Sequence, residues 1–139
     1  MNKKYQPKWK EVKKVWGAET ILVNIDKYCG KILHLKKDHR CSMHMHKLKT
    51  EHFHILSGYV VMEVGDDRFV MSPGDTIGIL PETYHRFTGV SDADILEIST
   101  THYEDDSYRL TQSERVTWYK KNIGDGLDKV LVYLRSLYK

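Results

Sequence analysis

Hydrophobic residues alternate with polar ones in short runs along this 139-residue chain, and turn-forming residues separate the runs. A period of two is typical of β-strands that bury one face. Nine such runs follow one another from Thr20 onward, with no helical pattern between them. The predicted strands are residues 20–25, 30–36, 41–46, 52–56, 59–64, 68–71, 76–80, 85–90 and 94–101.

Reversal signals stand between several of these runs. They are Ser57-Gly58, Gly65-Asp66-Asp67 and Pro73-Gly74-Asp75. Such residues suit the tight turns that join antiparallel strands. Short strands in this number and at this spacing predict an all-β fold, as a closed or sandwiched antiparallel sheet.

The two ends of the chain follow other patterns. Residues 1–14 are polar and unpatterned, which indicates an arm or an added edge strand. Near the C-terminus, Asp125 can cap a helix of about four turns. The apolar residues expected on one face of this helix are Leu127, Val130, Leu131, Leu134 and Tyr138. We expect the helix to cover barrel surface or a dimer interface.

Composition excludes several classes of protein. The net charge of +3 is modest and arises mainly in the first fourteen residues, so no nucleic-acid partner is expected. No window is long and apolar enough for a membrane span or an export signal, which predicts a soluble, cytoplasmic protein. Cys29 and Cys41 form no disulfide framework and are expected to be free thiols.

Two histidines lie two residues apart in one predicted strand. Because alternate residues of a strand share a face, His44 and His46 can point into one cavity. Glu51 can add a carboxylate from the next strand. A lone histidine is more often hydrogen-bonded or solvent-facing than a metal ligand, so this pair alone leaves the metal assignment open. His52 and His54 have the opposite strand parity and are predicted to lie outside the site.

The order of these residues resembles the first motif of the cupin family, HxHxxxxE followed by a glycine. The residues that fill it are His44, His46, Glu51 and Gly58. Residues 73–85 resemble the second cupin motif, in which a glycine precedes the last histidine ligand as Gly74 precedes His85. Pro81 stands one place later than in most members, and Glu82 replaces the usual glycine, so a differently bent hairpin is expected there.

The cupin resemblance implies a jelly-roll β-barrel that holds one divalent metal ion. The implied ligands are His44, His46, Glu51 and His85. Mixed nitrogen and oxygen ligation does not choose strongly among Zn, Mn, Fe, Co and Ni. No cysteine belongs to the set, which favours an open, ligand-binding or catalytic metal over a closed structural zinc site.

A narrower resemblance runs from Trp16 to Arg109, to the C-terminal isomerase domain of type II mannose-6-phosphate isomerases. The matching stretches are residues 15–17, 51–58, 95–98 and 104–109. The gap between His46 and Glu51 is longer here, and the HxHxxKxE form that includes Lys49 is also similar to D-lyxose isomerases. These likenesses imply aldose–ketose isomerisation of a sugar or sugar phosphate.

An aldose–ketose isomerase needs a base that moves a proton between C1 and C2, and positive charge near the oxygens. The candidates for proton transfer are Glu97, Lys49 and His102. The candidates for binding a phosphate are Arg109, Arg86, Arg40 and Lys31. We therefore predict catalytic roles for Glu97, Lys49 and Arg109.

Two other classes of function stay open at this point. A cupin of this type can also be an iron-dependent dioxygenase, which demands a redox metal and an apolar substrate cavity. It can equally be a non-catalytic sugar- or metal-binding module of carbohydrate biosynthesis. We expect a homodimer whose chain divides into an arm (1–14), a cupin barrel (15–116) and a helical extension (117–139).

Overall fold

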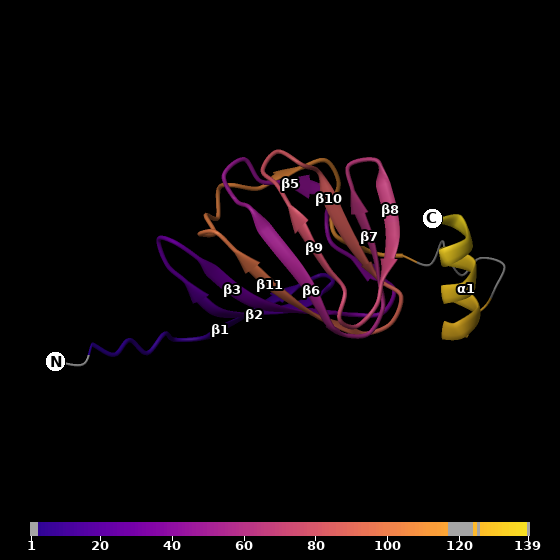
Figure 1. Ribbon diagram of the computed structural model, residues 1–139, viewed down its shortest axis with the longest axis horizontal. Coiled ribbons are helices and arrows are strands. Elements are labelled where there is room, and N and C mark those ends of the chain that lie inside the picture. Colours follow the sequence, from indigo (N-terminus) through magenta and orange to yellow (C-terminus); the bar gives the residue numbers. More distant parts are fainter. Residues whose placement is uncertain (1–2, 117–123, 125, 139) are drawn as a thin grey trace.

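The computed structural model describes residues 3–116, 124 and 126–138, which form two antiparallel β-sheets and one helix (Figure 1). The strands of the first sheet, in spatial order, are β1 (Lys10–Lys14), β2 (Gly17–Asn24), β3 (Cys29–Leu35), β11 (Ala93–Ser99), β6 (Glu51–Ser57) and β9 (Thr76–Ile79).

The second sheet is built around β10 (His85–Gly89). On one side β10 pairs with β7 (Val60–Val64), which pairs in turn with β8 (Asp67–Met71). The other strands of this sheet are β12 (Tyr108–Arg109), β5 (His44–Met45), β4 (His39–Arg40) and β13 (Glu114–Arg115). The expected all-β barrel of the jelly-roll type is confirmed.

Both sheets contribute to one apolar core. It contains Trp16, Leu33, Leu35, Cys41, Phe53, Ile55, Val60, Met62, Met71, Ile79, Phe87, Ala93 and Ile95. The same alternation that buries these residues also turns polar side chains inward. Lys31, Glu51 and Glu97 are all buried, on β3, β6 and β11 respectively. A buried charge requires compensation by partners, so these strands already mark where a site lies.

Each predicted strand has a counterpart, but the expected strand at 41–46 is reduced to β5, and the short strand β4 lies just before it. On β10, Thr88 pairs with Arg40 and His85 pairs with His44. The β4–β5 side therefore has one residue more than β10 between the two pairs, and the extra residue interrupts the ladder as a bulge does. The short strands β12 and β13 were not predicted.

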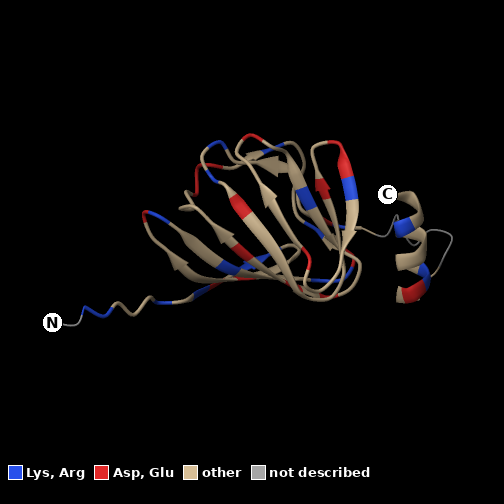
Figure 2. Cartoon of the chain, viewed as in Figure 1, with Lys and Arg blue, Asp and Glu red and all other residues tan. Residues whose placement is uncertain are grey.

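β1 extends the first sheet beyond β2. It carries part of the lysine-rich N-terminal segment, in which Figure 2 shows a series of basic residues. An edge strand pairs on one side only and tolerates charges on its exposed face, which explains why its sequence shows no clear hydrophobic alternation.

The C-terminal helix α1 (Leu127–Leu137) packs beside β8 at one side of the barrel (Figure 1). Its buried residues Val130, Leu131 and Leu134 form a second, smaller core with three valines of the barrel region. These valines are Val61, Val90 and Val116. The predicted helix is thus confirmed, but its 11 residues make about three turns where about four were expected. The residue at its N-cap is Gly126, whereas the expected cap Asp125 lies outside the described residues.

Gly58 closes the first motif in a backbone conformation that other residues rarely adopt. Its φ is +79°, and a Cβ at this position would lie 2.1 Å from the carbonyl oxygen of Asp92. Glycine is therefore required where β6 turns towards β7. Among the described residues, no helix is long and apolar enough to cross a membrane.

Candidate metal centre

Three of the four predicted ligands form a tight group of imidazoles. His44 lies on β5, His46 follows that strand, and His85 begins β10 directly opposite His44. One ring nitrogen from each lies within 4.8 Å of the others. The register of β5 with β10 thus brings together histidines that are far apart in the sequence.

Each imidazole is oriented by a hydrogen bond to a backbone carbonyl. Only an N–H can donate to a carbonyl oxygen, so Nδ1 carries a proton in all three rings. The acceptors are Ser42 for His44 (2.8 Å), Asp106 for His46 (2.6 Å) and Thr83 for His85 (2.9 Å). In a neutral imidazole this pattern leaves the lone pair on Nε2, which is the arrangement that metal-binding histidines adopt.

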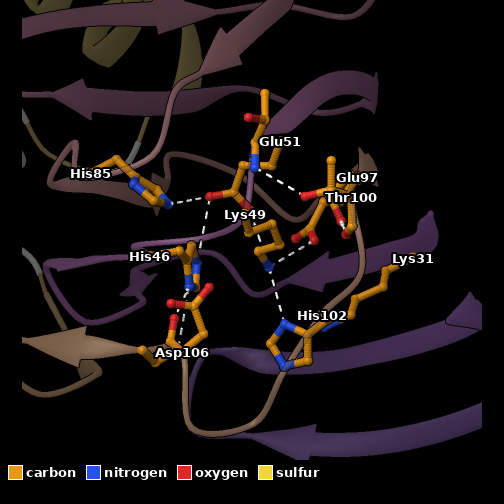
Figure 3. Close-up of polar contacts among 12 residues, drawn as sticks. Lys31, His46, Lys49, Glu51, His85, Glu97, Thr100, His102 and Asp106 are labelled. Carbon is orange, nitrogen blue, oxygen red and sulfur yellow. Dashed lines mark hydrogen bonds and ion pairs between the residues drawn. The ribbon is translucent and has the colours of Figure 1, made fainter. Parts of the chain in front are cut away.

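Glu51 from β6 completes the group from the opposite sheet. Its Oε1 lies 2.6 Å from Nε2 of His85 and 3.6 Å from Nε2 of His46 (Figure 3). Glu51 Oε1 and His85 Nε2 are buried and have no hydrogen-bond partner among the described residues. Two lone-pair atoms at this distance repel unless a proton or a cation lies between them. The donor set therefore fits a divalent metal ion.

The protonation states suit metal binding. Burial, with the neighbouring His85, lowers the pKa of His44 to about 3. Burial also lowers the pKa of His46, as does the charge of Lys49. Burial alone would raise the pKa of Glu51, but the contact with His85 and the charge of Lys49 outweigh it and lower the pKa to about 2. At neutral pH His44 and His46 are neutral, and Glu51 is a carboxylate.

Two residues for which the sequence predicted no role in the site, Asp106 and Glu82, hold the backbone around His46. The carboxylate of the buried Asp106 accepts hydrogen bonds from the backbone N–H groups of Lys47 (2.8 Å) and Leu48 (3.2 Å). The N–H of Glu82 donates to the carbonyl oxygen of His46 at 2.7 Å. Glu82 has a φ of +63°, so it retains the left-handed backbone of the glycine that it replaces.

A second polar group lies directly beside the predicted metal ligands. Nζ of Lys49 is 3.4 Å from Oε2 of Glu51, 3.2 Å from Oε2 of Glu97 and 3.1 Å from Nδ1 of His102 (Figure 3). Burial acts to lower the pKa of Lys49, but the carboxylates of Glu97 and Glu51 raise it overall. Burial raises the pKa of Glu97. Burial, with the charges of Lys31 and Lys49, lowers the pKa of His102 to about 4.

A cavity of about 360 Å³ opens onto both groups. The three residues predicted to be catalytic, Glu97, Lys49 and Arg109, all line it. Aromatic side chains, among them Trp16 and Phe53, form an apolar part of the wall. This volume is near the lower end of the ~300–1,000 Å³ that small-molecule sites occupy.

The other basic residues that were candidates for phosphate binding lie in different parts of the fold. Lys31 lines the cavity. Arg86 lies elsewhere and forms a two-pronged ion pair with Glu63, at 2.7 and 3.1 Å. Arg40 pairs with Glu114 and does not line the cavity.

The remaining histidines of β6 behave as their strand parity predicts. His52 is exposed, and His54 is bonded through Nδ1 to Oγ1 of Thr76 at 2.6 Å on the outer face. Neither belongs to the group that gathers His44, His46 and His85.

Comparison with known proteins finds similarity both in sequence and in fold. The chain is 27% identical over 106 residues to the mannose-1-phosphate guanylyltransferase RfbM of Salmonella typhimurium, a match that covers 73% of this chain and 22% of that protein. The chain thus spans about a fifth of this relative's length.

Two solved structures show the shared fold at low sequence identity. Pac13 of Streptomyces, described as a nucleoside dehydratase, superposes with a TM-score of 0.66 at 11% identity, over 84% of this chain and 94% of that one. CapF of Staphylococcus aureus, a capsular polysaccharide assembling protein, gives 0.63 at 19% identity, over 75% of this chain and 34% of that one.

The family model described as "Cupin domain" matches residues 31–100. This segment is half of the chain and holds the four predicted metal ligands, Gly58 and the wall residues Lys31, Lys49 and Glu97. The barrel and the converging histidines agree with that match. The chain belongs to the cupin family.

Proposed function

We propose that this cupin binds one divalent metal ion through His44, His46, Glu51 and His85, and isomerises an aldose or aldose phosphate to the corresponding ketose. The observation that carries the proposal is the position of Glu97, which Lys49 joins to the ligand Glu51 inside one cavity. The names of RfbM and CapF, which point to sugar phosphate and polysaccharide chemistry, support a carbohydrate substrate.

In this proposal Glu97 takes the proton from C2 and returns it to C1. Burial raises the pKa of Glu97, which suits a group that accepts and then donates a proton. Its Oε2 accepts from Lys49, whereas its Oε1 makes no hydrogen bond with any residue that the structure describes. Oε1 is therefore the oxygen that we assign to proton transfer.

Lys49 and Arg109 have supporting roles in the same proposal. Lys49 holds Glu97 and Glu51 at a fixed separation and keeps its positive charge beside both carboxylates. Arg109 lines the cavity and positions an anionic group of the substrate, such as a phosphate. A bound divalent ion would supply positive charge to an oxygen that becomes negative during the reaction. Zn, Mn, Fe, Co and Ni all suit the donor set.

The charged cavity wall bears on the alternative functions. An iron-dependent dioxygenase needs an apolar substrate cavity, but Glu19, Lys31, Lys49 and Glu97 all line this one. Carboxylates and ammonium groups instead match the hydroxyl groups of a sugar. A non-catalytic sugar-binding module would use the same wall, so turnover has to be measured directly.

The direct assay is proton exchange. In deuterated water, metal-loaded protein should incorporate deuterium at C2 of mannose 6-phosphate or lyxose and at C1 of fructose 6-phosphate or xylulose, as followed by NMR. Glu97→Gln should slow this exchange by ~10²- to 10⁴-fold, because a positioned base is lost. Glu63→Gln is the matched control, since Glu63 is a buried, ion-paired carboxylate outside the cavity.

Three outcomes separate the candidates. Exchange that depends on Glu97 supports the isomerase. Sugar binding without any deuterium incorporation supports the non-catalytic module. Oxygen uptake by iron-loaded protein supports a dioxygenase.

The proposal also includes a homodimer in the cytoplasm. Sedimentation equilibrium should return twice the mass of one chain at micromolar concentration. The mass of a single chain across that range would contradict the dimer.

A further inference from the structure

Charged side chains of alternating sign form a row along the cavity wall and lead away from the metal ligands. In order they are Glu51, Lys49, Glu97, Lys31 and Glu19. Lys31 stands directly opposite Glu97 in the pairing of β3 with β11, and its Nζ lies 3.5 Å from Oε1 of Glu19. At the cavity rim, Nζ of Lys14 lies 3.8 Å from the same oxygen.

The two lysines of this row differ in how many partners they have. An ammonium group carries three N–H donors. Those of Lys49 face three acceptors, on Glu51, Glu97 and His102. Lys31 has one hydrogen-bond partner among the described residues, Glu19, although it is only 3% exposed.

Donors left over on a buried ammonium are costly unless something binds them. Lys31 lines the cavity, and Figure 3 shows its side chain beside His102, whose pKa the charge of Lys31 helps to lower. Both ion pairs of Glu19 use Oε1, which leaves Oε2 able to accept. Lys31 and Glu19 thus offer a donor and an acceptor side by side.

The row crosses the neighbouring strands β6, β11, β3 and β2. Three gaps of about 4.8 Å between adjacent strands give it a length of roughly 14 Å. This is longer than one pyranose ring, and it suits an extended chain of carbon atoms that each carry a hydroxyl group.

We propose that Lys31 and Glu19 are specificity residues that bind neighbouring hydroxyl groups of an open-chain polyhydroxylated substrate, at C3 and C4. This inference rests on the proposed isomerase function and names the form of substrate that the site takes. When the substrate is bound in this way, its C1 and C2 lie between Glu97 and the metal ligands. The anionic far end of the substrate then points towards Lys14 and Arg109 at the rim.

Binding measurements test this pair independently of turnover. Isothermal titration calorimetry of the metal-loaded protein would use mannitol 1-phosphate, an open-chain hexitol phosphate, and analogues that lack the hydroxyl corresponding to C3 or C4 of the substrate. Removing one of these hydroxyls should weaken binding by about tenfold or more, as for a lost hydrogen bond to a charged group. In Lys31→Met or Glu19→Gln, removing the hydroxyl that the altered residue binds should weaken binding much less.

The control is Arg86→Met, which breaks a partly buried ion pair outside the cavity and should leave the preference for the intact hexitol unchanged. Glu19→Gln keeps the shape of the side chain if Lys31→Met fails to fold. No binding of the hexitol phosphate to the wild-type protein, or the same hydroxyl preference in all variants, would overturn the proposal. Binding with the expected preference but without proton exchange would leave it standing and refute the isomerase function instead.

Discussion

At the scale of single residues, backbone carbonyl groups determine what the histidines can do. A free imidazole can carry its proton on either nitrogen, but His44, His46 and His85 each donate from Nδ1. The lone pair on Nε2 is then available before any metal binds. Fixing the tautomer in advance avoids part of the cost of organising the site.

The first prediction concerns His46. His46→Ala should abolish stoichiometric metal binding, because no other side chain of the barrel can replace a ligand at that position. Elemental analysis of the purified protein after reconstitution provides the measurement. His52→Ala is the matched control, since His52 is exposed on the neighbouring part of the chain and should leave metal content unchanged. One metal per chain in the His46 variant would remove it from the ligand set.

A second prediction concerns the thiols. Burial raises the pKa of Cys41 to about 12, and it also raises the pKa of Cys29. At pH 8 roughly one Cys41 thiol in ten thousand is then a thiolate, which is the form that reacts with alkylating agents. The fraction rises with pH but stays below one half until pH reaches about 12.

Folded protein treated with iodoacetamide at pH 8 should therefore remain unmodified at Cys41, as read by mass spectrometry. The same protein unfolded in guanidinium should react fully at Cys29 and Cys41. Rapid labelling of Cys41 in the folded protein would mean that the cavity exposes a reactive thiol.

The site residues that could be predicted from the sequence are those that act through their side chains. His44, Glu51 and His85 stand at motif spacings that predict a common site. Asp106 could not be found in this way, because it acts on His46 through its backbone oxygen and on the 46–48 segment through backbone N–H groups. Such contacts leave no spacing pattern.

At the scale of elements, the alternation of hydrophobic and polar residues predicted the long strands well and the short ones poorly. β3 and β11 bury every second residue over seven positions, so their pattern is clear. β12 and β13 have two residues each and exposed side chains, and no alternation can appear over that length. The break between β4 and β5 depends on the partner strand β10, which a local pattern cannot include.

A third prediction concerns the helix α1. Leu131 is 6% exposed in the second core, whereas its neighbour Val132 is 71% exposed. Leu131→Asp would bury an unpaired carboxylate, at a cost of several kcal/mol, and should lower Tm by on the order of 10 °C. Val132→Asp introduces the same group on the outer face and should leave Tm nearly unchanged. Equal melting curves for the two variants, read by circular dichroism, would show that the helix contributes little to stability.

At the scale of the whole molecule, the candidate ligands come from both sheets. His44 and His85 belong to the second sheet, on β5 and β10, whereas Glu51 belongs to the first, on β6. A metal ion bound by all of them links the two sheets across the barrel. The sequence motifs predicted the candidate ligands, but such a link follows only from the way the two sheets face each other.

The last prediction follows from that link. The unfolded chain does not hold the four ligands together, so metal binding should stabilise the folded state by mass action. At a free metal concentration one hundred times Kd, the gain is about 2.7 kcal/mol, which corresponds to a rise in Tm on the order of 10 °C. Differential scanning calorimetry with a series of divalent ions, each reversed by a chelator, measures the rise and ranks the ions. His46→Ala should show no such rise, and an equal rise in this variant would place the metal elsewhere on the protein.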